Sequence, residues 1–190
     1  LKFAKGKYLS FLDSDDFFAP QMLEELYNGC EKNSVDISIV KTKAYDNRTG
    51  IYTDMPWVLR EERLPSKNPF RYQDIPDRIF NIGNGWAWDK LFKRSMVEEN
   101  HLYFQEIRTS NDMFFVFAAY ICANGIYVIH KQLAFQRTNQ KNSLSVTRER
   151  SWKCFYEALL ELKGFLEKRN LYSLLEKSFL NWAVDFSKWN

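Results

Sequence analysis

Residues 8 to 16 read Tyr8-Leu9-Ser10-Phe11-Leu12-Asp13-Ser14-Asp15-Asp16, an apolar run that ends abruptly in acidic side chains. A short, nearly continuous apolar run is typical of a strand that other elements cover on both faces. The carboxylates of Asp13, Asp15 and Asp16 follow at the carboxyl end of this predicted strand. Ligands of open α/β sheets generally bind at that end of the strands. The stretch therefore predicts an α/β fold with a ligand site at residues 13 to 16.

The acidic cluster needs a compensating charge, because neighbouring carboxylates repel one another. Mg²⁺ and Mn²⁺ prefer oxygen ligands and often complete their coordination with substrate phosphates. A simpler alternative is a helix start, where acidic side chains interact favourably with the helix dipole. That alternative explains Asp16, and in part Asp15, but not Asp13. We therefore favour a site for a divalent cation and a phosphate-bearing ligand.

The remaining sequence predicts a mixed α/β body over residues 1 to 145 and a two-helix tail, packed on it, over residues 146 to 190. Apolar residues at helical spacing follow Pro20, and residues 35 to 40 alternate as in a strand. A second helix is expected from about residue 111 to 123, starting at a Ser110 cap, and two strands after it. Residues 46 to 80 are irregular and contain four prolines, as in a functional loop.

The composition indicates one globular domain and argues against several classes of protein. The chain has 190 residues, of which 45% are apolar and 17% aromatic, enough for one domain with a sizeable core. A net charge of +3 is too small to indicate nucleic-acid binding. Three widely separated cysteines predict reduced thiols in a cytosolic protein, and no apolar run is long enough to span a membrane. Because a strand pattern starts almost at Leu1, we expect further sequence of the same protein before it.

Residues 4 to 16 resemble the segment around the DXD motif of bacterial family 2 inverting glycosyltransferases, which have a GT-A fold. In that family the motif ends a central strand and holds the metal that bridges the donor's diphosphate. The resemblance implies that Asp13 and Asp15 form the DXD pair and that Asp15 is the ligand of Mn²⁺ or Mg²⁺. Asp13 would face the ribose or diphosphate of the donor, with Asp16 supporting both.

Three later stretches continue the resemblance in the family's order. Residues 88 to 92 are similar to a W-N-K-L-Y stretch, with Asp89 in place of the Asn. Residues 104 to 106 and then 110 to 112 resemble an F-x-E and E-D pattern, whose last residue is the catalytic base; Asn111 replaces the usual Glu, and the Asp is retained. Residues 137 to 145 are similar to a strand-to-loop segment that closes over the diphosphate. The resemblance covers residues 4 to 145 and implies a partial GT-A fold with a mixed sheet, followed by the helical tail.

The resemblance makes Asp112 the catalytic base, which removes the proton of the acceptor hydroxyl as that oxygen attacks the anomeric carbon. Without the resemblance, Asp112 is equally an ordinary first-turn residue of a helix. Arg137 and Lys90 are candidates to neutralise the leaving diphosphate, or are simple surface charges.

Acceptor binding is assigned to Trp86, Trp88 and Glu106. The two tryptophans lie beside glycines and fit either a platform on which a sugar stacks or ordinary core packing.

The sequence thus predicts a metal-dependent, inverting glycosyltransferase of the hexosyltransferase type. Its partners would be a nucleotide-sugar donor and a glycan or lipid-linked acceptor in polysaccharide biosynthesis. The expected location is the cytoplasm, with possible peripheral contact at the inner face of the membrane.

Two alternatives stay open. The chain could be an inert acceptor-side binding module that lacks the nucleotide-base half of the fold. In a phosphatase of the haloacid dehalogenase type, Asp13 would be the nucleophile and Asp15 the acid/base. That family needs Thr or Val where this chain has Phe17. An EF-hand is excluded, because Phe18 occupies the position that needs Gly.

Overall fold

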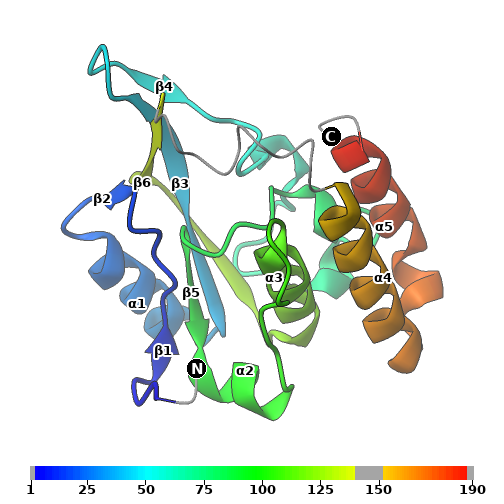
Figure 1. The fold of residues 1–190 in the computed structure, drawn as a ribbon. Helices are drawn as coiled ribbons and strands as arrows, with labels where there is room; N and C mark the ends of the chain where they lie inside the picture. The colour runs from blue at the N-terminus through cyan, green and yellow to red at the C-terminus, as the bar shows by residue number, and fades with distance from the viewer. Residues whose placement is uncertain (1–2, 140–151, 188–190) are drawn as a thin grey trace.

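The computed structural model describes residues 3 to 139 and 152 to 187, which form a mixed sheet with helices on both faces (Figure 1). The strand order is β1-β5-β3-β6-β2, and β4 pairs with β3 off this path. Strands β3 and β6 are parallel, and the other pairs are antiparallel. The strands are β1 (Tyr8–Leu9), β2 (Phe17–Phe18), β3 (Ile37–Asp46), β4 (Tyr52–Asp54), β5 (Lys90–Lys93) and β6 (Ile126–Thr138).

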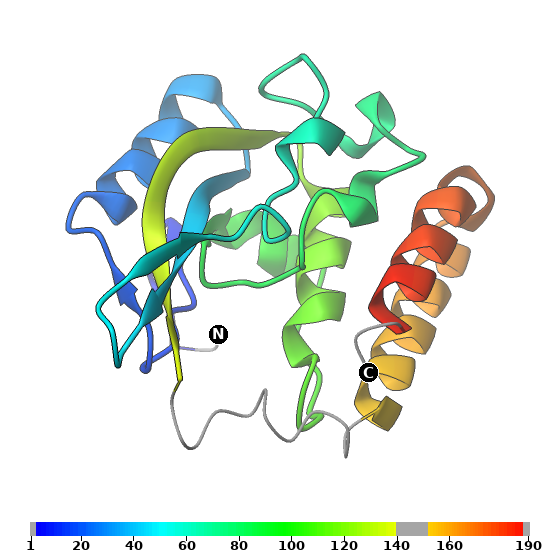
Figure 2. The ribbon, with the colours of Figure 1, turned by 90° about the horizontal axis from the view of Figure 1, so that it is seen from above.

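Helix α1 covers one face of the sheet and α3 the other, while α4 and α5 lie beyond α3 (Figures 1 and 2). The helices are α1 (Met22–Asn33), α2 (Arg94–Glu99), α3 (Asn111–Cys122), α4 (Trp152–Lys168) and α5 (Tyr172–Ser187). Three short 3₁₀ turns interrupt the segment between β4 and β5: η1 (Glu61–Arg63), η2 (Tyr72–Asp74) and η3 (Ile79–Asn81). In the part of the chain that the structure describes, no helix is both long and apolar enough to cross a lipid bilayer.

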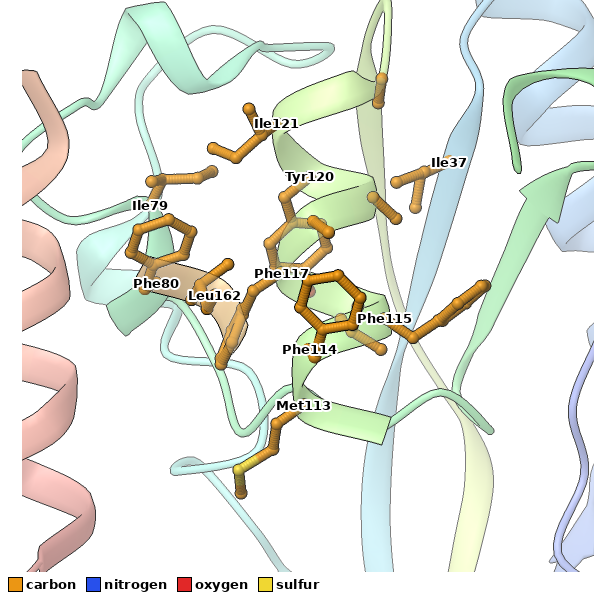
Figure 3. Close-up of a cluster of buried hydrophobic side chains, with 14 of the residues drawn as sticks. Ile37, Ile79, Phe80, Met113, Phe114, Phe115, Phe117, Tyr120, Ile121 and Leu162 are labelled. Atoms are coloured by element: carbon orange, nitrogen blue, oxygen red, sulfur yellow. The ribbon is translucent and has the colours of Figure 1, made fainter. Parts of the chain in front are cut away.

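Helix α3 is the centre of the hydrophobic core, and every residue from Met113 to Ile121 is buried. A helix that is apolar all round needs partners on all sides. Figure 3 shows Phe115 on the side of α3 toward Ile37 of β3, and Phe117 on the side toward Phe80. Since residues of α4 and α5 belong to the same core cluster as the sheet, both helices share one continuous core with it.

Two strand predictions are wrong in detail. The predicted buried central strand is reduced to β1, two residues at the edge of the sheet that pair with β5. Beyond Leu9 the chain leaves the sheet, because the ring of Phe11 packs against Phe92, Phe104 and Phe115 instead of continuing the ladder. The two strands predicted after α3 are one, β6, whose register against β3 shifts near its middle.

The helices α1 and α3 and both tail helices form where the periodicity predicts them, whereas β3 starts at Ile37 and runs to Asp46, beyond the predicted residues 35 to 40. Ser110 precedes α3, but its side chain makes no capping hydrogen bond, contrary to the prediction. The predicted boundary at residue 145, and Ser143, Leu144 and Ser145 of the predicted loop, lie outside the described residues.

Candidate functional site

A cleft of about 830 Å³ opens where several distant segments meet. The segment after β1, the strand β4, the turn η3, the start of α3, the end of β6 and the last turns of α5 all contribute to its lining. Its lining includes five charged side chains and an indole: Asp13, Arg108, Asp112, Arg137, Asp185 and Trp86. Positions that are about 100 residues apart in the sequence, 13 and 112, therefore border one space.

The three aspartates predicted at the ligand site lie close together in the structure. Each of Asp13, Asp15 and Asp16 offers a carboxylate oxygen, and these oxygens lie within 4.8 Å of one another. Partial burial and the charge of Asp15 raise the pKa of Asp13. Burial raises the pKa of Asp16 to about 6, although a hydrogen bond from the backbone of Arg137 opposes this. Crowded oxygen donors that repel one another are a donor set that suits Mg²⁺ or Mn²⁺.

Arg137 lies beside this cluster at the end of β6. Its backbone N–H donates to Oδ1 of Asp16 over 2.8 Å. Its guanidinium carbon lies 4.8 Å from the ring centroid of Phe17, a cation–π arrangement, and Nη1 donates to Asn47 over 3.2 Å. These contacts follow from the pairing of β2 with β6, which joins Phe17 to Phe135. The cleft thus has a positive side chain fixed next to its acidic corner, which Asp13, Asp15 and Asp16 form.

Asp112 enters the cleft from the first turn of α3. Ser110, two residues earlier, has a φ of 61°, in the left-handed region that costs a residue with a side chain free energy. This conformation turns the chain sharply into the helix, so that residues 110 to 112 all line the cleft. Because the residues of α3 from Met113 to Ile121 are buried, the position of Asp112 is fixed by the whole core.

Trp86 and Trp88 both border the cleft and stack on each other, with centroids 5.2 Å apart and planes at 24°. Trp88 is otherwise buried, in a small core cluster between α1 and the sheet, whereas Trp86 is half-buried. Each tryptophan therefore fits a different one of the two interpretations, core packing or a platform for a sugar. Trp88 packs in the core, and Trp86 is the one with surface left for a ligand.

Two predicted site residues do not reach the cleft. Lys90 is only 2% exposed and forms a buried ion pair with Asp89, with 2.5 Å between Nζ and Oδ1, so the structure offers no path from its ammonium group to a diphosphate. Glu106 is exposed on the loop before α3 and is not among the lining residues.

Sequence reasoning missed the contribution of α5. Trp182 and Asp185 of this helix line the cleft, and Asp185 pairs with Arg60, which also lines it, with Nη1 and Oδ2 3.1 Å apart. These two charges are 125 residues apart in the sequence. No local pattern in the sequence signals such a pair.

Gly83 lines the cleft and forms an isolated antiparallel bridge with Leu59, so the two backbone segments approach closely here. A Cβ at Gly83 would lie 2.4 Å from the carbonyl oxygen of Val58, a backbone atom that cannot rotate away. We expect Gly83→Ala to lower the free energy of unfolding by about 2 to 3 kcal/mol. Gly164→Ala is the matched control, because no atom lies within 4 Å of its Cβ and alanine favours a helix by about 1 kcal/mol. Urea unfolding of both variants checks this; equal midpoints would contradict the prediction.

Comparison with known proteins gives concordant matches. Residues 1 to 100 match the family described as Glycosyl transferase family 2. The poly(ribitol-phosphate) beta-glucosyltransferase of Bacillus spizizenii is 32% identical over 99% of this chain and 28% of its own length. The poly(ribitol-phosphate) beta-N-acetylglucosaminyltransferase TarS of Staphylococcus aureus is 24% identical over 100% of this chain and 32% of its own length.

The fold has a solved counterpart. The crystal structure of S. aureus TarS residues 1–349 in complex with UDP-GlcNAc superposes with a TM-score of 0.69, over 97% of this chain and 51% of that one, at 19% identity. The chain therefore spans about half of that structure and less than a third of the B. spizizenii relative.

Proposed function

Because the chain belongs to glycosyl transferase family 2 and has part of the GT-A fold, we propose that its cleft is where a sugar passes from a nucleotide-diphosphate donor to an acceptor hydroxyl. The observation that carries this proposal is the convergence of Asp13, Asp112 and Arg137 on one cleft. These residues come from three motifs that are distant in the sequence. A chance resemblance at each motif would not bring all three side chains to the same space.

The donor's diphosphate is assigned to the acidic corner. Asp15 would be the ligand of Mn²⁺ or Mg²⁺, with Asp13 and Asp16 beside it, since their oxygens are close enough to share one ion. The cation, when bound, supplies positive charge to the diphosphate as it leaves. The guanidinium of Arg137 would contribute a second positive charge at this end, and the ring of Phe17 holds it there. Lys90 has no part in this set, because it is buried behind the wall.

The acceptor end is assigned to Asp112 and the exposed face of Trp86. The Asp112 carboxylate would accept the proton of the attacking hydroxyl, and attack from the face opposite the diphosphate inverts the anomeric centre. The indole of Trp86 offers an apolar surface against which a sugar or polyol chain can pack. Two relatives are named for transfer to poly(ribitol phosphate), so polyol-phosphate chains belong among the acceptors to be tried.

The decisive test is calorimetry with Mn²⁺ and a panel of UDP-, GDP- and TDP-sugars, followed by a transfer assay with the donor that binds. We expect a UDP-sugar to bind only with the cation present, because one solved counterpart holds UDP-GlcNAc. Donor binding without transfer to any acceptor would favour the inert binding module. That module is the second candidate, because this chain covers only 51% of the TarS structure. Phosphate release from a generic phosphomonoester would favour the phosphatase.

We expect Asp15→Asn to weaken binding of Mn²⁺ and donor by at least about tenfold to 100-fold, since loss of a group that only supports a metal ligand already has an effect of this size. Glu24→Gln on the exposed surface of α1 is the control for the loss of one negative charge. Unchanged cation affinity in Asp15→Asn would remove Asp15 from the metal site.

A further inference from the structure

The cleft has a second indole with exposed surface besides that of Trp86. Trp57 lines the cleft and is 37% exposed, whereas Met55 and Val58, close to it in the chain, are buried. The proposed function uses only Trp86 as an apolar surface for the acceptor. Rings that combine a large apolar face with a polar N–H are typical of binding surfaces. Trp57 therefore adds a binding surface that the proposed function does not use.

An antiparallel bridge between Leu59 and Gly83 joins the two segments that carry these indoles. Trp57 precedes the bridge by two residues on one segment, and Trp86 follows it by three on the other. Two backbone hydrogen bonds flank the bridge: Arg60 N–H to Ile82 over 2.8 Å and Asn84 N–H to Val58 over 3.2 Å. The two indoles thus belong to one wall of the cleft, in which the backbone fixes their spacing.

A cation lies on the same segment as Trp57. Arg60 lines the cleft, and its side chain is 20% exposed. Its Nη1 lies 3.1 Å from Oδ2 of Asp185, and Nη1 of Arg63 lies 3.5 Å from the same oxygen. Glu62 lies 3.9 Å from Nε of Arg63 but is 68% exposed, so that pair contributes little. Two guanidinium groups share one carboxylate oxygen, which leaves positive charge in excess at this wall.

The helix α5 is held against this wall by a buried contact. Oγ of Ser178 accepts a hydrogen bond from the backbone N–H of Phe80 over 2.8 Å. Asp185 lies on the same helix, so its carboxylate holds Arg60 at a defined place in the cleft. A side chain that is already ordered loses less conformational freedom when a ligand binds. The guanidinium of Arg60 is therefore well prepared to bind an anionic group.

We propose that Trp57, Arg60 and Asp185 form a second acceptor subsite, which binds the unit of a chain next to the one that receives the sugar. This inference rests on the proposed function, which places the receiving unit at Asp112 and Trp86. The indole of Trp57 packs against the C–H groups of the neighbouring unit, and Arg60 binds the anionic link between the units. The acceptor that fits is a polyol or sugar chain with phosphodiester links.

The test compares a short and a long acceptor probe by ¹⁹F NMR of the chain labelled with 5-fluorotryptophan. Ribitol is the one-unit probe, and a synthetic three-unit oligomer of ribitol phosphate is the long one. The signals are assigned by their loss in Trp57→Phe and Trp86→Phe. We expect the oligomer to shift both signals and ribitol to shift only that of Trp86, because ribitol is too short to reach the second subsite.

Variants then measure how much the subsite contributes to affinity. By calorimetry, Trp57→Ala and Arg60→Gln should each weaken binding of the oligomer by about tenfold, the size expected for loss of one apolar surface or one charge-assisted hydrogen bond. Arg60→Gln leaves Asp185 paired with Arg63, so it creates no unpaired charge. Trp57→Phe keeps an apolar ring and should restore most of the affinity.

Tyr156→Ala is the matched control for loss of an exposed ring, because Tyr156 is 55% exposed and does not line the cleft. Its affinity for the oligomer should equal that of the parent chain. A merely structural role for Trp57 would also abolish the response of the Trp86 signal to ribitol in Trp57→Ala, whereas the proposed subsite leaves that response in place.

A Trp57 signal that the oligomer does not shift, or that ribitol shifts equally, would overturn the inference. So would an unchanged oligomer affinity in both variants. Equal binding of maltotriose, a neutral three-unit chain, would overturn the role of Arg60 in binding an anionic link. Neither NMR nor calorimetry with these probes needs a donor or turnover. Failure of every donor to react would therefore refute the proposed function, while the subsite is decided separately.

Discussion

Asp112→Asn is expected to lower kcat for sugar transfer by about 10²- to 10⁴-fold, the usual contribution of a general base. The amide has nearly the shape of the carboxylate but cannot accept the proton of the acceptor hydroxyl. Donor affinity should change by less than about threefold, because the proposed donor site lies at the acidic corner and not at α3. Single-turnover kinetics with the donor that the panel identifies, together with calorimetry, measure the two quantities separately.

Asp77→Asn is a suitable control for this substitution. Asp77 is partly exposed, pairs with Arg78 and Lys177, and does not line the cleft. Its loss removes one carboxylate from the protein without touching the proposed base. Transfer by Asp112→Asn at the rate of Asp77→Asn would remove Asp112 from the mechanism, whereas a matching loss of donor affinity would place Asp112 at the donor instead.

Local sequence patterns were sufficient to predict those elements in which the spacing of apolar residues shows the type of element. The helix α1 and the tail helices each bury one face, so their apolar residues repeat with the period of a helix. The acidic cluster was readable for the same reason: its three carboxylates are neighbours in the chain as well as in space.

Features that depend on distant partners were not readable. Lys90 looks like a surface cation in the sequence, and only the packing of α3 against β5 shows that it is enclosed between Asp89 and Tyr120. The ladder of the predicted first strand stops at Leu9 because Phe11 finds a pocket of rings that come from three other segments. The wall that α5 adds to the cleft depends on a helix that begins about 160 residues after Asp13 in the sequence.

The placement of α5 leads to the largest expected change in stability. Trp182 is 4% exposed, and its ring centroid lies 4.8 Å from that of Phe117 and 5.6 Å from that of Phe155. The indole thus joins α5 to both α3 and α4. We expect Trp182→Ala to lower the free energy of unfolding by about 3 to 5 kcal/mol, because the cavity it leaves cannot close without moving all three helices.

Leu180→Ala on the same helix is the matched control, since Leu180 is 49% exposed and its loss should change stability by less than about 1 kcal/mol. Urea unfolding followed by tryptophan fluorescence and by far-UV circular dichroism should show one shared transition for each variant, as expected of one continuous core. If α4 and α5 instead formed a separate unit, Trp182→Ala would unfold them first, and the two probes would separate. Because Trp182 also lines the cleft beside Asp185, a coincident transition would mean that the stability of the core and the shape of the proposed site depend on the same side chain.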